Sequence, residues 1–355
     1  MPGRRIGPDL IDAWRDLVER AAEPNPFAEP EIVLPALRHL AGRSRAGILT
    51  VRDGSRLRAL LPVLWPVLVP APGVRWLPVP VLQSWVEPYQ PLGTPLLDAD
   101  VAVPAMAALL RPPASLPAPL LLLRYFADGG PVAAALDEAL AAGGQEAVRL
   151  KTYERALLLR EGGPAPSGNR KNRYNRLRRR RAEMEAGLGP VRVVDRADDP
   201  AAVAEFLALE ASGWKGAAGT AMACRPAHAS WFREVCDGLR ATGGLEVLSL
   251  EAGGRTTAML VNFAAGDGSL HFKSAYDESL GDYRPGEQLL MHCVDEGPGC
   301  RFAWRDSATV PDNTLFNQLW PSRLTLSTIL VPLHGRVGNA AVALARRLRS
   351  GAGAA

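Results

Sequence analysis

The sequence predicts a mixed α/β (α+β) fold that is built twice, each half being a mixed, mostly antiparallel sheet flanked by helices. The 355 residues suffice for two domains at roughly 100–200 residues per domain. In the second half, short β-branched strands alternate with amphipathic helices in the order β-α-α-β-β-β-α-β-α-β, and the first half repeats this order more weakly. We expect a first domain at 1–160, a linker with a basic helix at 161–190 and a second domain at 191–355.

In the second half, Asp198, Asp199 and Pro200 form a helix start signal after a β-branched strand. Three consecutive strands joined by glycine turns predict an antiparallel meander, and the β-α-β segment after it predicts a parallel crossover. The expected strands are 191–196, 245–251, 256–264, 270–276, 301–305 and 323–331, and the expected helices begin near 200 and 286 or span 226–239, 313–319 and 337–348.

The first half gives the same kinds of signal. The expected helices are 10–22, 31–40, 101–110 and 131–142, and the expected strands are 47–52, 57–69, 74–85, 120–125 and 146–159. The most apolar window, 59–74, contains four prolines and is too short to cross a bilayer as a helix. The N-terminus lacks the apolar region of a secretory signal, so we expect a cytoplasmic protein.

The charge of the chain is concentrated in one segment. The net charge is +4, yet the twelve residues from Arg170 to Arg181 hold eight basic and no acidic side chains. Only this segment is a candidate for binding a polyanion, with Tyr174 as its one aromatic residue. The competing interpretations are a solvated helix between the domains and a contact with an anionic donor or with acidic residues of the first half. The four cysteines form no CxxC pair, so neither a zinc site nor any other metal is expected.

Four segments together resemble a known family. They are the basic stretch 170–181, EASGWKGAAGTA at 210–221, FKSAYDESLGDYRPGEQLL at 272–290 and DSATVPDNTLFNQLW at 306–320. They resemble GNAT-type acyltransferases of the CelD-like group, named for a link with cellulose biosynthesis and related to the tandem-domain Fem peptidyltransferases. The resemblance implies tandem GNAT-like domains and a donor that is acyl-CoA (acetyl-CoA or longer), or aminoacyl-tRNA as in the Fem branch. The chain departs from the family at 283–288, which has one glycine, and at Phe316–Asn317, where many relatives have Tyr-Lys.

An anion site is expected where the helix after the third meander strand begins. Unpaired first-turn amides and the helix dipole favour phosphate there, and a Pro-Gly start allows close approach. The candidate donor-binding residues of this turn are Tyr283, Arg284, Pro285, Gly286, Glu287 and Gln288. The strand before it should splay from its neighbour, and the backbone of Phe272, Ser274 and Tyr276 could then bind the pantetheine arm and the oxyanion. Alternation places His271 and Lys273 on one face of this strand.

Asp306 follows the strand at 301–305, so its carboxylate could accept a proton from the acceptor amine, and Asn317 could orient that amine. Trp214, Lys215 and Asp277 are candidates for substrate binding. Loop capping by Asp306, a surface amide at Asn317 and a structural turn at 214–215 are the alternatives.

The sequence favours a cytoplasmic N-acyltransferase that moves an acyl group from acyl-CoA to an amine of a small molecule, lipid or sugar, in polysaccharide, lipid or cell-envelope metabolism. Two alternatives remain. One is an aminoacyl-tRNA-dependent transferase of the Fem sort, with the RNA held by Arg170–Arg181, and the other is an inactive GNAT-like scaffold.

Overall fold

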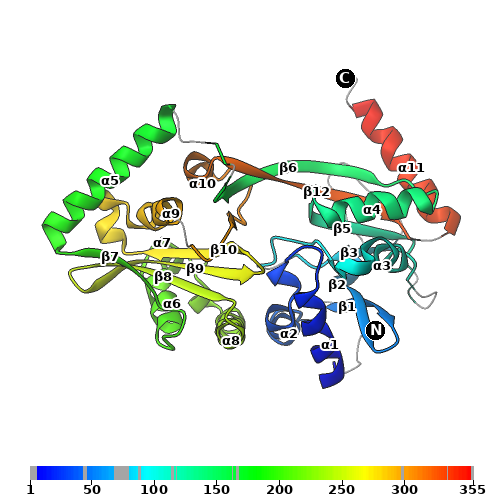
Figure 1. Ribbon diagram of the computed structural model, residues 1–355, viewed down its shortest axis with the longest axis horizontal. Helices are drawn as coiled ribbons and strands as arrows, with labels where there is room; N and C mark the ends of the chain where they lie inside the picture. Colours follow the sequence, from blue (N-terminus) through cyan, green and yellow to red (C-terminus); the bar gives the residue numbers. More distant parts are fainter. Residues whose placement is uncertain are drawn as a thin grey trace. The chain divides into compact units, whose positions relative to one another are not determined.

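The structure is a computed structural model (Figure 1). It describes residues 6–42, 46–67, 80–86, 89–112, 116, 118–161, 163–164, 168–296, 300–333 and 335–352. Parts of the expected strands 57–69 and 74–85 and of the linker 161–190 lie outside these residues. The chain divides into two compact units, one formed by Met1–Glu154 with Thr325–Ala355 and the other by Arg155–Leu324.

The first unit contains the elements expected for the N-terminal half. Its helices are α1 (Pro8–Glu19), α2 (Pro30–His39), α3 (Ala102–Leu109), α4 (Pro131–Ala142) and α11 (Gly335–Ala352), and its strands are β1 (Ala46–Asp53), β2 (Arg56–Val67), β3 (Val81–Ser84), β4 (Leu96–Leu97), β5 (Leu120–Ala127) and parts of β6 (Val148–Leu159) and β12 (Ser322–Pro332). The strands are ordered β1-β2-β3-β5-β12, with β4 beside β2. Only the β3–β5 pair is parallel in this series.

Helices cover both faces of this sheet because its side chains alternate between two cores. Leu121, Leu123 and Ile329 pack with α3 and α4. Leu122 and Leu330 point the other way, into the core that includes α11.

The second unit contains the elements expected between 168 and 324. Its helices are α5 (Gly168–Leu188), α6 (Ala202–Ser212), α7 (Trp214–Ala217), α8 (Pro226–Thr242), α9 (Pro285–Asp295) and α10 (Thr314–Leu319), and its strands are β7 (Val191–Asp195), β8 (Leu245–Ala252), β9 (Arg255–Ala265), β10 (Gly268–Tyr276) and β11 (Trp304–Asp306). The order is β6-β11-β10-β9-β8-β7. The predicted antiparallel meander and the parallel β10–β11 crossover are confirmed.

Different helices lie on the two faces of this second sheet, with α9 on one side and α6 and α8 on the other (Figure 1). Ala258 and Leu260 of β9 pack with α5, α9 and α10. Phe263 of the same strand stacks on Phe272, whose ring also contacts Phe232 of α8. Helices and their side chains therefore cover both faces of this sheet.

The C-terminal segment belongs to the first unit, which differs from the expected division at 160 and 190. Residues Leu326–Pro332 of β12 pair with β5, whereas Leu157–Leu159 of β6 pair with β11 of the second unit. The physical reason is strand pairing: each unit completes its sheet with a strand from the distant part of the sequence. Local periodicity detects a strand but not its partner.

A partly buried carboxylate that contacts the start of α4 gives a pH-dependent prediction. Oε2 of Glu23 accepts a hydrogen bond from the Val132 amide at 3.0 Å, and burial raises the pKa of Glu23 from 4.5 to about 7. The folded state therefore holds a proton that the unfolded chain has lost in this window, so this contribution to stability is full below pH 4.5 and disappears as the pH rises through 7. Glu23→Gln keeps an acceptor for the amide but does not titrate. Between about pH 5 and 8, the unfolding free energy of the wild type should fall relative to that of Glu23→Gln in denaturant titrations. Parallel curves would contradict the prediction.

Candidate functional site

The parallel strands β10 and β11 are paired at one end only and then separate. The parallel pairs are Gly268–Trp304, Ser269–Arg305 and Leu270–Asp306. Beyond Leu270, β10 continues to Tyr276 beside β9, whereas β11 ends at Asp306. The expected splay is thus present in the pairing, and the β11-facing edge of His271–Tyr276 carries backbone groups that β11 does not pair.

A β-bulge in β10 sits at the start of this free edge. The register with β9 shifts between His271 and Lys273. As a result, Phe272 and Lys273 both face α6 and α8, where Phe272 stacks on Phe263 and Lys273 bonds Glu210. The ring of His271 lies 5.0 Å from that of Phe316, on the α10 side. The prediction that His271 and Lys273 share a face is wrong, because a bulge adds one residue and breaks the alternation.

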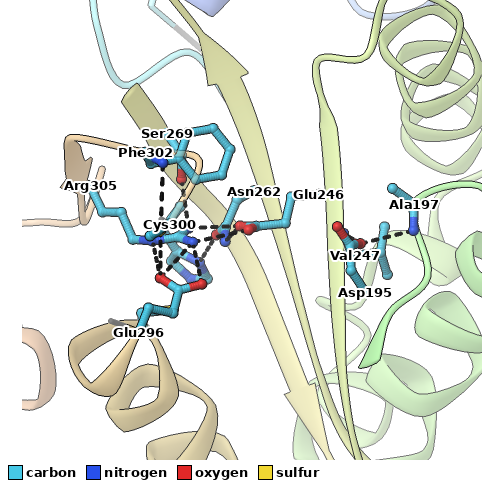
Figure 2. A network of polar contacts seen from close by, with 12 residues as sticks. Asp195, Ala197, Glu246, Val247, Asn262, Ser269, Glu296, Cys300, Phe302 and Arg305 are labelled. Atoms are coloured by element: carbon cyan, nitrogen blue, oxygen red, sulfur yellow. Dashed lines mark hydrogen bonds and ion pairs between the residues drawn. The ribbon is translucent and has the colours of Figure 1, made fainter. Parts of the chain in front are cut away.

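A buried polar network closes the paired end of the splay (Figure 2). Arg305 of β11 donates to Glu246 of β8 at 2.7 and 3.0 Å, to Ser269 of β10 at 3.0 Å and to Glu296, just after α9, at 2.9 and 3.0 Å. Asn262 of β9 donates to Glu246 at 2.5 Å. One guanidinium therefore connects β11 to two other strands of the sheet and to the end of α9, which fixes where β10 and β11 part.

His271 extends this network toward the opening. Its Nδ1 lies 3.2 Å from Oδ1 of Asn262, and because an amide oxygen only accepts, the histidine donates. Burial, with Lys215 and Lys273 nearby, lowers the pKa of His271 to about 3. The ring is therefore neutral at physiological pH.

The turn into α9 has the geometry of an anion site. Arg284 adopts a left-handed conformation (φ 54°), Pro285 is the first helical residue, and the Gln288 amide bonds the Arg284 carbonyl at 3.1 Å. The amides of Gly286 and Glu287 precede that bond, and a helix offers them no internal acceptor. A Cβ on Gly286 would meet only the Tyr276 ring, at 3.6 Å, so there is space above this turn.

The side chains of the turn are held by hydrogen bonds. The Glu287 carboxylate accepts from Arg284 at 2.9 Å and from Arg173 of α5 at 2.7 Å. Gln288 is buried and donates to the Tyr283 carbonyl at 2.8 Å. Glu287 and Gln288 thus shape the turn, whereas Arg284 remains more than half exposed.

Asp306 lies in a buried ion pair. Its Oδ2 accepts from Arg155 at 2.5 Å, its Oδ1 accepts from the Ala308 amide at 2.9 Å, and both charged side chains are 1% exposed. Both carboxylate oxygens are therefore engaged, which fits the loop-capping alternative. Asn317, half-buried on α10, donates to the Pro311 carbonyl at 2.8 Å.

Among the substrate-binding candidates, the Lys215 side chain contacts the backbone of β10 directly. Its Nζ is 3.2 Å from the Ser274 carbonyl of β10 and 3.6 Å from Oε1 of Glu210. Burial and the neighbouring Lys273 lower the pKa of Lys215, although Glu210 opposes the shift. The loop next to β10 therefore carries a half-buried ammonium beside the edge where β11 has ended.

Trp214 begins α7, next to Lys215, and Asp277 directly follows the end of β10. Trp214 is 60% exposed, and its amide donates to Glu278 at 2.8 Å. Asp277 accepts from the amide and hydroxyl of Ser279, which, with Arg255, lowers its pKa. Asp277 is thus part of a turn, while Trp214 presents an aromatic surface.

Sequence analysis missed Glu210, which is completely buried. It accepts from Lys273 at 2.5 Å and from the Met222 amide at 2.8 Å. A signal was present: Glu210 lies three and four residues after Leu207 and Phe206, on the apolar face of α6, whereas Leu209 is half-buried. Arg155 and Arg173 left no such local signal.

The basic helix α5 is packed rather than solvated all round. Tyr174, Leu177 and Met184 are buried against α9 and α10, and the Tyr174 hydroxyl donates to the Leu319 carbonyl at 2.5 Å. Tyr174 is therefore not exposed for stacking on a base. Within the described ranges, no cluster of three His, Cys, Asp or Glu side chains could hold a metal ion, and no described helix is long and apolar enough to cross a membrane.

Comparison with known proteins assigns the class of this unit. Residues 170–299 match the family described as acetyltransferase (GNAT) domain. The match covers the meander, the bulged strand and the turn into α9, and it supports an N-acyltransferase. Among curated protein sequences, none matches the chain.

Solved structures show that the likeness in fold extends over about nine-tenths of the chain. The crystal structure of FemX is similar over 90% of this chain and 95% of its own, with a TM-score of 0.55 and 11% identity. A protein of unknown function from Bacteroides thetaiotaomicron is similar over 91% and 97%, with a TM-score of 0.53 and 10% identity. At these identities the likeness shows a shared fold alone, whereas the match to the GNAT family model covers residues 170–299.

Proposed function

We propose that this protein transfers an acyl group from acyl-CoA to an amine, with the donor bound between the free edge of β10 and the turn into α9. The observation that carries the proposal is the end of β10–β11 pairing at Leu270, together with the Pro-Gly start of α9, the next α-helix in the chain, at Pro285. The free edge can bind an extended amide-bearing arm by hydrogen bonds, and the helix start can bind phosphate. Arg284 would add a charge to that phosphate site.

In this proposal the backbone performs most of the chemistry. The neutral amine nitrogen attacks the thioester carbonyl and gives up one proton, the carbon–sulfur bond then breaks, and the coenzyme leaves as a thiol whose sulfur takes up the proton that the amine lost. Amides on the free edge of β10, at Phe272, Ser274 and Tyr276, would stabilise the oxyanion. Holding the acyl-CoA and the amine together at that edge would supply the rest of the rate acceleration through proximity.

Asp306 is proposed to shape the end of β11 rather than to accept the proton, since both its oxygens are engaged. Trp214 and Lys215 would border the acceptor, with Asp277 and Asn317 further out. The acceptor class is an amine on a small molecule, lipid or sugar. A role in polysaccharide or cell-envelope metabolism follows from the CelD-like resemblance.

Substitution of Gly286 tests the donor site without harming the fold. Aspartate is favoured in the first turn of a helix, and a Cβ at this position would be 3.6 Å from the Tyr276 ring, an ordinary van der Waals contact. Gly286→Asp should therefore fold normally yet lose acyl-CoA binding, because its carboxylate repels phosphate and competes for the first amides. Gly286→Asn is the uncharged control of the same size and should retain more of the affinity.

The measurement is thermal stability with and without acetyl-CoA and longer acyl-CoAs. A ligand at 100 times its dissociation constant adds about 2.7 kcal/mol to a folded protein. Equal stabilisation of the wild type and both variants would place the phosphates elsewhere. Failure of every acyl-CoA to stabilise the wild type would refute the proposed donor and leave aminoacyl-tRNA, or a scaffold without catalysis, as the working hypothesis.

A further inference from the structure

A cationic cavity lies between the start of α5 and the end of α10, outside the residues assigned above to the donor turn. Its volume is about 440 Å³, and its described lining consists of Asn169, Arg170, Arg173, Arg176, Asn317 and Gln318. Three lining residues carry positive charge and the other three are neutral carboxamides. The volume lies in the range of small-molecule sites.

The three arginines repeat every three residues along α5, so they share one face of the helix. Like charges at this spacing repel one another, and an anion would relieve that repulsion. Other arginines of α5 have carboxylate partners: Arg178 pairs with Asp295 and Arg180 with Glu183. Within the residues that the structure describes, no ion pair is recorded for Arg170 or Arg176.

Two buried donors in this arginine cluster also favour a bound anion. The Nε atoms of Arg170 and Arg173 are both buried and have no hydrogen-bond partner among the described residues. A buried donor left unsatisfied costs free energy. A phosphate accepts several hydrogen bonds at once and matches the forked geometry of a guanidinium.

One side chain links the cavity to the donor turn. Arg173 lines the cavity, donates to Gln318 there, and also donates to Glu287 in the first turn of α9 at 2.7 Å. A ligand with two separate phosphate groups could therefore occupy both places. Coenzyme A has this chemistry, since it carries a diphosphate in its chain and a phosphate monoester on its ribose.

We propose that this arginine cavity binds a phosphate monoester next to the phosphate site of the α9 turn. The source that the proposed function supplies is the ribose 3′-phosphate of CoA, so this part of the inference rests on that function. The other source of the same chemistry is a phosphate on the acceptor. Arg170 and Arg176 would bind the monoester, and Arg173 would stand between the two sites.

The test compares CoA with 3′-dephospho-CoA by calorimetric titration of the full-length protein. The wild type should bind CoA at least about tenfold more tightly, the size of one charge-assisted contact. Arg170→Ala/Arg176→Ala should bind CoA only as tightly as it binds dephospho-CoA, and its affinity for dephospho-CoA should match that of the wild type. Arg178→Ala/Arg180→Ala removes the same charge from the same helix outside the cavity lining and should keep the wild-type preference.

One further probe, phosphoethanolamine, distinguishes the two sources of the phosphate and separates the cavity proposal from the donor proposal. If the wild type binds CoA and dephospho-CoA equally but binds phosphoethanolamine through Arg170 and Arg176, the monoester belongs to the acceptor. If no form of CoA binds while phosphoethanolamine does, the cavity proposal stands and the proposed donor fails. If the cavity variant binds every probe as the wild type does, the cavity proposal is overturned while the donor site tested at Gly286 is untouched.

Discussion

Asp306→Ala is expected to destabilise the second unit by about 3–5 kcal/mol, because it leaves Arg155 charged and buried without the carboxylate it now contacts. The loss should appear in denaturant unfolding as a lower midpoint with an unchanged slope. Asp306→Asn should also destabilise, since a neutral amide cannot balance the guanidinium.

The matched control removes both charges. Arg155→Met combined with Asp306→Leu replaces the ion pair by apolar groups and should recover part of the stability that Asp306→Ala loses. A catalytic role predicts a different pattern, in which Asp306→Asn folds as stably as the wild type and only turnover falls. That pattern would return Asp306 to the role of proton acceptor.

Removal of residues 325–355 is expected to unfold the first unit. The segment supplies Leu326, Ile329, Leu330 and Val331, all completely buried, to cores on both faces of that sheet. Truncating one such side chain typically costs about 2–5 kcal/mol, so losing the whole strand exceeds the roughly 5–15 kcal/mol that stabilise a domain.

Hydrogen exchange of β5 measures this effect, because β5 loses its partner strand. A chain that ends at Leu324 should show little protection of β5. A control that ends at Leu333 keeps β12 without α11, and it should protect β5 substantially better. If the segment instead completed the second unit, as the expected boundary at 191 implies, β5 would be equally protected in both.

Short-range features of this protein followed from the sequence. Periodicity and turn residues located the three meander strands, and Pro285 with Gly286 located the start of α9. The end of β10–β11 pairing also agrees with the splay predicted at 271–276. These features depend on residues within a few positions of one another, where propensity and alternation act.

The contacts of the charged side chains could not be predicted from the neighbouring sequence. Alternation placed Lys273 beside His271, but one inserted residue turned it toward Glu210 on the opposite face. Glu287, expected at the phosphate, instead receives Arg284 and Arg173. A carboxylate pairs with whichever cation the fold brings near it. The residues around the carboxylate in the sequence do not indicate which cation that is.

The sequence by itself determined the class of fold, the order of its elements and the position of the Pro-Gly turn at which we propose that a donor phosphate binds. Only the tertiary structure decided that Asp306 meets Arg155, that Thr325–Ala355 belong to the first unit, and that Arg170, Arg173 and Arg176 share a cavity with α10. The physical reason is range: helix and strand signals act over two to four residues, whereas strand partners and buried ion pairs are selected by packing between segments far apart in the chain.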